Sequence, residues 1–62
     1  MKKDELARLE AYLRKTFGAK NLTVRARPKK DDSAEVYLGD DFVAILFRED
    51  EDGEVSYQFQ MA

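Results

Sequence analysis

The sequence predicts an α+β fold in which one N-terminal helix packs on a four-stranded antiparallel meander sheet. Apolar residues before Gly18 recur every three or four positions, as they do on one side of a helix. After Asn21 apolar and polar residues alternate, which is typical of half-buried strands. Turn-forming segments divide this second part into four runs, and no repeat or linker indicates a second domain, so residues 1–62 are expected to form one domain.

The helix is expected from about residue 4 to residue 17. Its first turn is acidic and its last turn is basic, which suits the helix dipole. Gly18 then supplies a C-terminal stop, because glycine readily adopts the left-handed conformation that ends many helices. One side of this helix is apolar and consists of Leu6, Leu9, Leu13 and Phe17.

Four strands are expected, at residues 22–28, 34–39, 42–48 and 54–61. Pro28 ends the first strand, and the polar segment Lys29–Ser33 is expected to be a loop. Gly39 begins a tight reversal before the third strand, and the acidic segment Glu49–Gly53 contains an Asp-Gly pair typical of a hairpin. The third strand differs from the others because residues 42–47 are all apolar, so both of its faces need cover.

The turns predict which residues share a face of the sheet, because a shift of one residue exchanges the two faces. A two-residue turn after Leu38 or Gly39 and a three-residue loop over residues 51–53 give the same assignment for the third strand. The face under the helix then contains Val24, Ala26, Val36, Leu38, Val43, Ile45, Phe47, Tyr57, Phe59 and Met61. The opposite face contains Arg25, Arg27, Glu35, Tyr37, Phe42, Ala44, Leu46, Ser56, Gln58 and Gln60.

The centre of the opposite face is expected to be an apolar interaction patch of Tyr37, Phe42, Ala44 and Leu46. One helix cannot cover both sides of the sheet, and an apolar patch with a polar rim usually marks an interaction site. The patch is either an ordinary face partly covered by the chain ends or a homodimer interface in which two sheets stack. We expect the homodimer, because a 62-residue chain without cysteine or histidine has neither disulfides nor the best zinc ligands to supplement its small core.

Composition and charge indicate a folded cytoplasmic protein. The chain is 44% hydrophobic and 39% charged, and its net charge of -2 gives no general attraction to nucleic acid or to anionic membranes. No stretch approaches the roughly 20 apolar residues that span a bilayer, and the N-terminal MKKDELARLE contains no apolar signal region. We therefore expect no membrane association.

Catalytic chemistry is not expected from these residues. In a chain without histidine and cysteine the candidate nucleophiles are serines, threonines and lysines, and the proximity of Lys30 to Ser33 is more typical of a turn than of a catalytic pair. The paired carboxylates lie in turns between apolar strands, where they are solvated and serve to form the turns. We therefore expect no enzyme activity, no catalytic residue, no cofactor and no small-molecule substrate.

The acidic segment before Gly53 resembles part of a calcium-binding loop of the EF-hand type. Aligning Gly53 with the loop glycine places Arg48 at the first ligand position and Phe59 at the last, which excludes that type of site. No metal site is predicted, although weak, nonspecific binding of divalent ions by the acidic run stays open.

A basic strip of Arg25, Arg27, Lys29 and Lys30 runs along the first strand and its exit loop. With Tyr37 and Phe42 beside it, the strip is typical of surfaces that bind single-stranded nucleic acid, where cations follow the backbone and aromatic rings stack on bases. A cross-strand ion pair between Arg27 and Glu35 is the simpler explanation. Weak single-stranded nucleic-acid binding is therefore the alternative function.

The chain resembles a family of very short alphaproteobacterial proteins catalogued as a domain of unknown function. The resemblance covers nearly the whole chain and is most specific in SAEVYLGD (residues 33–40) and DGEVSYQFQM (residues 52–61), with KKDELARLEAYLRKTFG at the start. It implies no activity, substrate or catalytic residue. The function that we expect is that of a small non-enzymatic interaction module, homodimeric through the exposed sheet face or bound there to another protein.

Overall fold

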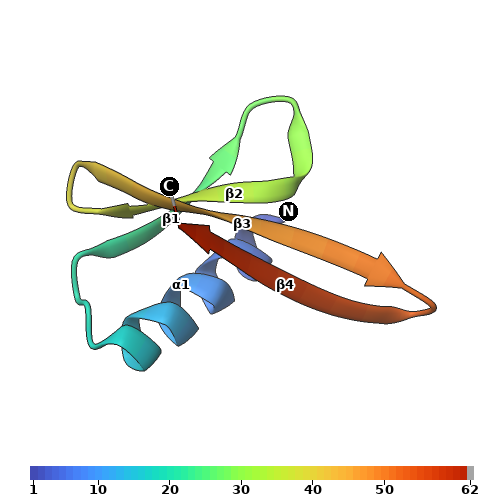
Figure 1. Ribbon diagram of the computed structural model, residues 1–62, viewed down its shortest axis with the longest axis horizontal. Helices are drawn as coiled ribbons and strands as arrows, with labels where there is room; N and C mark the ends of the chain where they lie inside the picture. Colours follow the sequence, from blue (N-terminus) through green and yellow to red (C-terminus); the bar gives the residue numbers. More distant parts are fainter. Residues whose placement is uncertain (62) are drawn as a thin grey trace.

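The computed structural model describes residues 1–61 and has the α+β architecture predicted from the sequence (Figure 1). One helix is followed by a four-stranded sheet whose strands lie in chain order, each antiparallel to the next. The elements are α1 (Lys3–Phe17), β1 (Leu22–Arg27), β2 (Lys30–Leu38), β3 (Asp41–Glu51) and β4 (Glu54–Met61).

Helix α1 ends at Phe17, as predicted, and is held close to the first strand. Gly18 has a left-handed φ of 65°, and the N–H of Ala19 donates to the carbonyl oxygen of Arg14 at 3.1 Å, which closes the last turn. Residues 18–21 are the whole connection between the helix and the sheet. Because this connection is short, α1 packs against β1.

The connection between β1 and β2 is shorter than predicted. The two-residue turn Pro28–Lys29 joins the strands, with its second residue in a left-handed conformation of φ 65°. Residues 30–33, predicted to be a loop, therefore belong to β2, although their pairing near the turn is irregular. Glu35 lies opposite Arg25, so the predicted pairing of Arg27 with Glu35 is wrong.

The hairpin between β3 and β4 is also tighter than predicted. Asp52 and Gly53 form a two-residue turn in which both φ values are positive, 52° and 81°, as in a type I′ turn. The predicted three-residue loop is therefore one residue too long. As a result Phe59 lies opposite Leu46 and not opposite Ile45.

The turn between β2 and β3 has two residues, as predicted, but a β-bulge follows it. Tyr37 pairs with Phe42, whereas Val36 pairs with Ala44, so Val43 has no residue opposite it. Nothing in the alternation of apolar and polar residues marks this bulge, because residues 42–47 are all apolar. The bulge shifts β3 by one residue relative to β2.

The bulge and the tighter hairpin together reverse the predicted faces of residues 44–47 of β3. Each shifts this part of β3 by one residue against a neighbouring strand, so the faces predicted for the paired residues of the other strands hold while those of residues 44–47 exchange. Phe42 lies before the bulge and keeps its predicted outward face. Ala44 and Leu46 lie under α1 and are 0% and 3% exposed, so their predicted place in the outward patch is wrong. Ile45 and Phe47, predicted to lie under the helix, are on the outward face instead.

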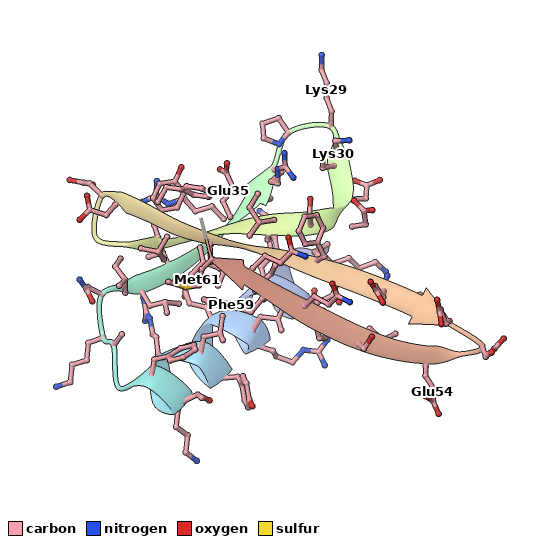
Figure 2. The ribbon with its side chains drawn as sticks, in the orientation of Figure 1. Lys29, Lys30, Glu35, Glu54, Phe59 and Met61 are labelled. Carbon is pink, nitrogen blue, oxygen red and sulfur yellow. The ribbon has the colours of Figure 1, made fainter. Side chains whose placement is uncertain are left out.

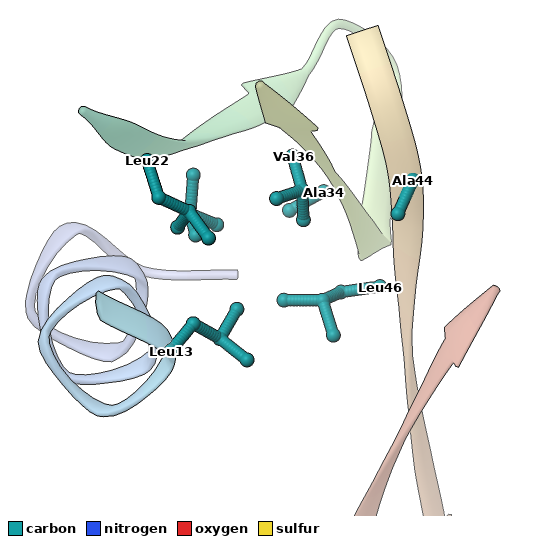
Figure 3. Close-up of a cluster of buried hydrophobic side chains, with 7 residues drawn as sticks. Leu13, Leu22, Ala34, Val36, Ala44 and Leu46 are labelled. Carbon is teal, nitrogen blue, oxygen red and sulfur yellow. The ribbon is translucent and has the colours of Figure 1, made fainter. Parts of the chain in front are cut away.

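The core lies between α1 and the first three strands. Figure 3 shows the buried side chains gathered between the helix and the sheet, which bends around them. Of the residues described in β4, Phe59 alone packs against this cluster, and it is only partly buried. The buried apolar residues are Leu13, Leu22, Val24, Ala34, Val36, Ala44 and Leu46.

The hairpin of β3 and β4 extends beyond the rest of the sheet as an arm (Figure 1). The last pair between β2 and β3 is Ser33 with Phe47, so residues 48–51 of β3 are paired with β4 alone. Five carboxylates lie at or near the tip, at Glu49, Asp50, Glu51, Asp52 and Glu54. They form a solvated acidic end, and Glu54 points away from the rest of the molecule (Figure 2).

Candidate interaction site beside strand β4

An apolar groove separates α1 from β4. Its volume is about 440 Å³, and its walls come from one side of the helix and from the helix-facing side of β3 and β4. The groove exists because α1 lies against β1 and leaves the other end of the same sheet face uncovered. The groove is lined by Leu9, Tyr12, Leu13, Leu46, Tyr57 and Phe59.

Large apolar side chains around this groove are exposed to solvent. Tyr12 of α1 is 65% exposed and Met61 of β4 is 71% exposed. The rings of Phe17 and Phe59 lie 5.5 Å apart and connect the end of α1 to β4 at one end of the groove. The sequence correctly placed Tyr57, Phe59 and Met61 on the helix-facing side of β4, but the helix leaves Tyr57 and Met61 exposed.

The free edge of β1 is closed by side chains of the helix. Glu10 Oε1 accepts the backbone N–H of Val24 at 3.1 Å, and Arg14 Nε donates to the carbonyl oxygen of Leu22 at 2.7 Å. Glu10 and Arg14 also form an ion pair at 3.8 Å within the helix. These contacts satisfy backbone groups that an edge strand would otherwise present to another chain.

The free edge of β4 has no comparable cover within residues 1–61. No side chain of α1 donates to or accepts from the backbone of β4 in this part of the chain. Residues 55–61 contain no charged residue and no proline, and their pairing with β3 has no bulge. Charge, proline, bulges and covering elements are the usual protection of edge strands, so β4 is an unprotected edge. We call the groove and this edge together the β4 surface.

A polar cluster fixes one end of the groove. Glu5 accepts a hydrogen bond from the Tyr57 hydroxyl, and Arg48 Nε lies 3.1 Å from the same carboxylate oxygen. The hydrogen bond from Tyr57 lowers the pKa of Glu5, burial opposes this shift, and the charge of Arg48 reinforces it. The same hydrogen bond raises the pKa of Tyr57. The cluster therefore ties β4 to the first turns of α1 and orients the Tyr57 ring.

Two of the four predicted patch residues meet on the outer face, the side of the sheet away from α1. The rings of Tyr37 and Phe42 lie 5.7 Å apart in an edge-to-face arrangement. Arg25 lies over the Tyr37 ring at 4.0 Å, and the Tyr37 hydroxyl donates to Glu35 at 3.5 Å. The outer face is therefore partly covered by its own polar side chains, and Ala44 and Leu46 are not on it.

The four predicted basic residues do not form one continuous strip. Arg25 is stacked on the outer face, and Arg27 Nη1 donates to Ser33 Oγ at 3.2 Å. Figure 2 shows Lys29 and Lys30 at the tip of the hairpin between β1 and β2. The charges are thus divided between the face of the sheet and the end of a hairpin.

The groove could have been foreseen from two features of the sequence. A helix whose apolar side spans only four regularly spaced residues is too narrow to cover four strands. The neutral stretch at residues 55–61 also lacks the charges that protect an edge. The faces predicted from the sequence drew attention away from both features, because they placed the uncovered apolar surface on the side of the sheet opposite the helix.

Among the described residues, no three acidic, histidine or cysteine side chains come close enough together to hold a metal ion. A hollow of about 580 Å³ beside the start of α1 is lined by charged side chains of both signs, including Glu5 and Arg48. None of the helical segments described is long and apolar enough to cross a membrane.

These features define a small α+β domain with an apolar groove beside an unprotected strand edge. The chain belongs to the family described as Protein of unknown function (DUF3126), whose model matches residues 5–62. The resemblance to a domain of unknown function is thereby confirmed. No curated protein and no solved structure matches the chain.

Proposed function

We propose that the protein is a non-enzymatic cytoplasmic interaction module that binds protein through the β4 surface. The proposal rests on one observation, that the unprotected edge of β4 adjoins the apolar groove. An extended segment that adds to a sheet edge gains main-chain hydrogen bonds from the edge and specificity from pockets that receive every second side chain. The β4 surface offers both at the same place.

The groove determines which segments fit. Neighbouring strands lie about 4.8 Å apart, so a strand added to β4 would lie along the groove opening. Its helix-facing side chains would contact Tyr12, Tyr57 and Phe59, and its other side chains would continue the polar row of Ser56 and Gln58. The partner segment is therefore an extended stretch that alternates apolar and uncharged polar residues.

The outer face is less suited to this role than the sequence suggested. Its predicted patch loses Ala44 and Leu46 to the core, and Ile45 and Phe47, which replace them on this face, are both partly buried. Arg25 covers the ring of Tyr37, which leaves Phe42 as the most open aromatic side chain there. We therefore assign the interaction to the β4 surface.

An alternating peptide provides the test. The probe is an eight-residue peptide in which valine and threonine alternate between terminal lysines. Its binding is monitored by amide hydrogen exchange of the protein. We expect protection of residues 55–61 that saturates with peptide concentration and is lost in Tyr57→Lys but kept in Phe42→Glu. Protection confined to another strand, or none at millimolar peptide, would refute the proposal.

Weak binding of single-stranded nucleic acid through the outer face is the second candidate. It is favoured by the stacking of Arg25 on Tyr37 beside Phe42, with Arg27 bonded to Ser33 further along β1 and Lys29 and Lys30 at the hairpin tip. A fluorescent single-stranded oligonucleotide should bind at low salt, and its affinity should fall steeply as salt rises because phosphate contacts release counterions. The double variant K29A/K30A should reduce this dependence. An affinity that depends neither on salt concentration nor on Lys29 and Lys30 would rule out nucleic-acid binding through this face.

A further inference from the structure

We infer that the partner of the β4 surface is a second copy of this chain, paired antiparallel along residues 55–61 about a two-fold axis at Gln58. The inference rests on the proposed function, since it names the occupant of the same surface. The two four-stranded sheets would join through their β4 strands into one continuous sheet, with both helices on the same side.

Strand β4 is complementary to itself in this arrangement. A two-fold axis at Gln58 places each residue opposite one that is equally far from Gln58 in the other direction, so apolar meets apolar and polar meets polar. On the helix-facing side Tyr57 lies opposite Phe59 of the second copy. On the outer side Ser56 lies opposite Gln60 of the second copy. Gln58 is the midpoint of the uncharged stretch, so this register pairs all of that stretch.

Electrostatics favour self-pairing at β4 over self-pairing at β1. Like charges placed opposite each other destabilise a strand pair, and residues 55–61 carry none. Strand β1 carries Arg25 and Arg27, and Glu10 and Arg14 already bond to two backbone groups of its free edge, the N–H of Val24 and the carbonyl oxygen of Leu22. With one edge open and the other closed, pairing stops at two copies and does not continue into a fibre.

The small core gives a second reason for a dimer. Chains of this length usually need disulfides, a metal or a partner subunit in addition to one core, and this chain has no cysteine. The sheet bends around the core, and β4 lies at its open end (Figure 3). A strand added there would continue the bend and cover the exposed side chains of Tyr57 and Met61.

Sedimentation equilibrium of the full chain tests the inference. We expect a concentration-dependent dimer, weakened at least tenfold by Gln58→Lys, which sets two like charges facing each other at the axis. Phe42→Glu on the outer face is the matched control and should leave the dimer constant unchanged. A wild-type monomer up to several hundred micromolar overturns the inference, as does a dimer that Phe42→Glu breaks and Gln58→Lys does not.

A pair of double variants tests the register. S56K/Q60E places opposite charges across the two-fold axis, whereas S56K/Q60K places like charges there. We expect the first to dimerise at least tenfold more tightly than the second at low salt, with the difference reduced at high salt. Equal dimer constants at low salt would overturn the register.

Hydrogen exchange of the wild type keeps the test independent of how the variants fold. In the dimer, backbone amides at the free edge of β4 should become more protected as protein concentration rises, and those of β1 should not. Concentration-independent exchange along residues 55–61 overturns the inference. A monomer that still binds the alternating peptide at β4 would overturn self-pairing and leave the proposed function standing, so the two failures are distinguishable.

Discussion

The two edges of the sheet differ in what lies against them. Along β1, the helix supplies Glu10 and Arg14, which bond to backbone groups of Val24 and Leu22. Along β4, the same helix leaves a groove and an uncharged edge. The cause is the short connection over residues 18–21, which holds the helix beside β1. One helix thus caps one edge and leaves the other open.

The largest loss of stability is expected from Leu13→Ala, which removes the buried helix side chain that packs α1 against the sheet. Leu13 is buried in the core cluster, and a leucine-to-alanine change in such a position costs about 2–5 kcal/mol. A single core of this size supplies roughly 3–5 kcal/mol, so the variant should be largely unfolded at 25 °C by circular dichroism.

Tyr12→Ala is the control for that experiment. Tyr12 is the neighbouring residue on the helix but lies on the exposed rim of the groove. Its loss should cost below about 1 kcal/mol, as expected for surface positions. Equal destabilisation by the two substitutions would show that the helix does not pack as described.

A smaller effect is expected from Glu10→Ala, which opens the closed edge. The backbone N–H of Val24 loses its charged acceptor, which should lower the free energy of unfolding by about 1–3 kcal/mol in urea denaturation. With both edges open, light scattering should also detect species larger than a dimer. Glu10→Gln keeps a side-chain acceptor and should show less of both changes. Wild-type size and stability in Glu10→Ala would contradict the capping of β1.

The order and type of the elements were predictable because they depend on local periodicity. The alternation after Asn21, the helical spacing before Gly18 and the turn residues all act within a few positions along the chain. Strand ends were less predictable. Lys29 takes a left-handed conformation that favours glycine, so a polar segment expected to be a loop became part of β2.

The faces of β3 were not predictable, and the candidate site moved with them. An all-apolar strand fits either orientation, so its own sequence cannot reveal a shift of one residue. The bulge at Val43 and the two-residue turn before Glu54 each produced such a shift. The two-residue turn before β3 was predicted correctly but the bulge after it was missed, and the loop before β4 was predicted one residue too long. The two assignments of β3 agreed with each other because each missed a shift of one residue. Tyr37 and Phe42 kept their predicted face, and Ala44 and Leu46 did not.

The contact between Tyr57 and Glu5 predicts that the stability of the fold decreases at acidic pH. Because the pKa of Glu5 is lowered in the folded protein, its charged form stabilises the fold above the unfolded pKa of about 4.3, and this contribution is lost as pH falls through the lower folded pKa. Tyr57→Phe removes the largest cause of the shift and should cost below about 1 kcal/mol at pH 7. The difference from wild type in urea midpoint should disappear towards pH 3.

Glu5→Gln controls for the charge. It keeps an acceptor for the Tyr57 hydroxyl but cannot titrate, so its stability should change less with pH than that of the wild type. Arg48 still pairs with Glu5 in Tyr57→Phe, so that variant should retain part of the acid dependence. A midpoint difference between Tyr57→Phe and wild type that is the same at pH 7 and pH 3 would mean that Tyr57 does not act through the carboxylate.

The smallest effect is expected from the outer face of β1, where Arg25 covers Tyr37. An exposed cation over an aromatic ring contributes about 0.5–1 kcal/mol, so Arg25→Ala should lower the urea midpoint slightly. Arg25→Lys keeps the charge but not the planar stacking, so its urea midpoint should lie between those of the wild type and Arg25→Ala. A double-mutant cycle with Tyr37→Leu should return a coupling of this size, and additive losses would contradict the contact. Because this face points away from the β4 surface, none of these variants should change the dimer constant, which separates stacking within the chain from pairing between chains.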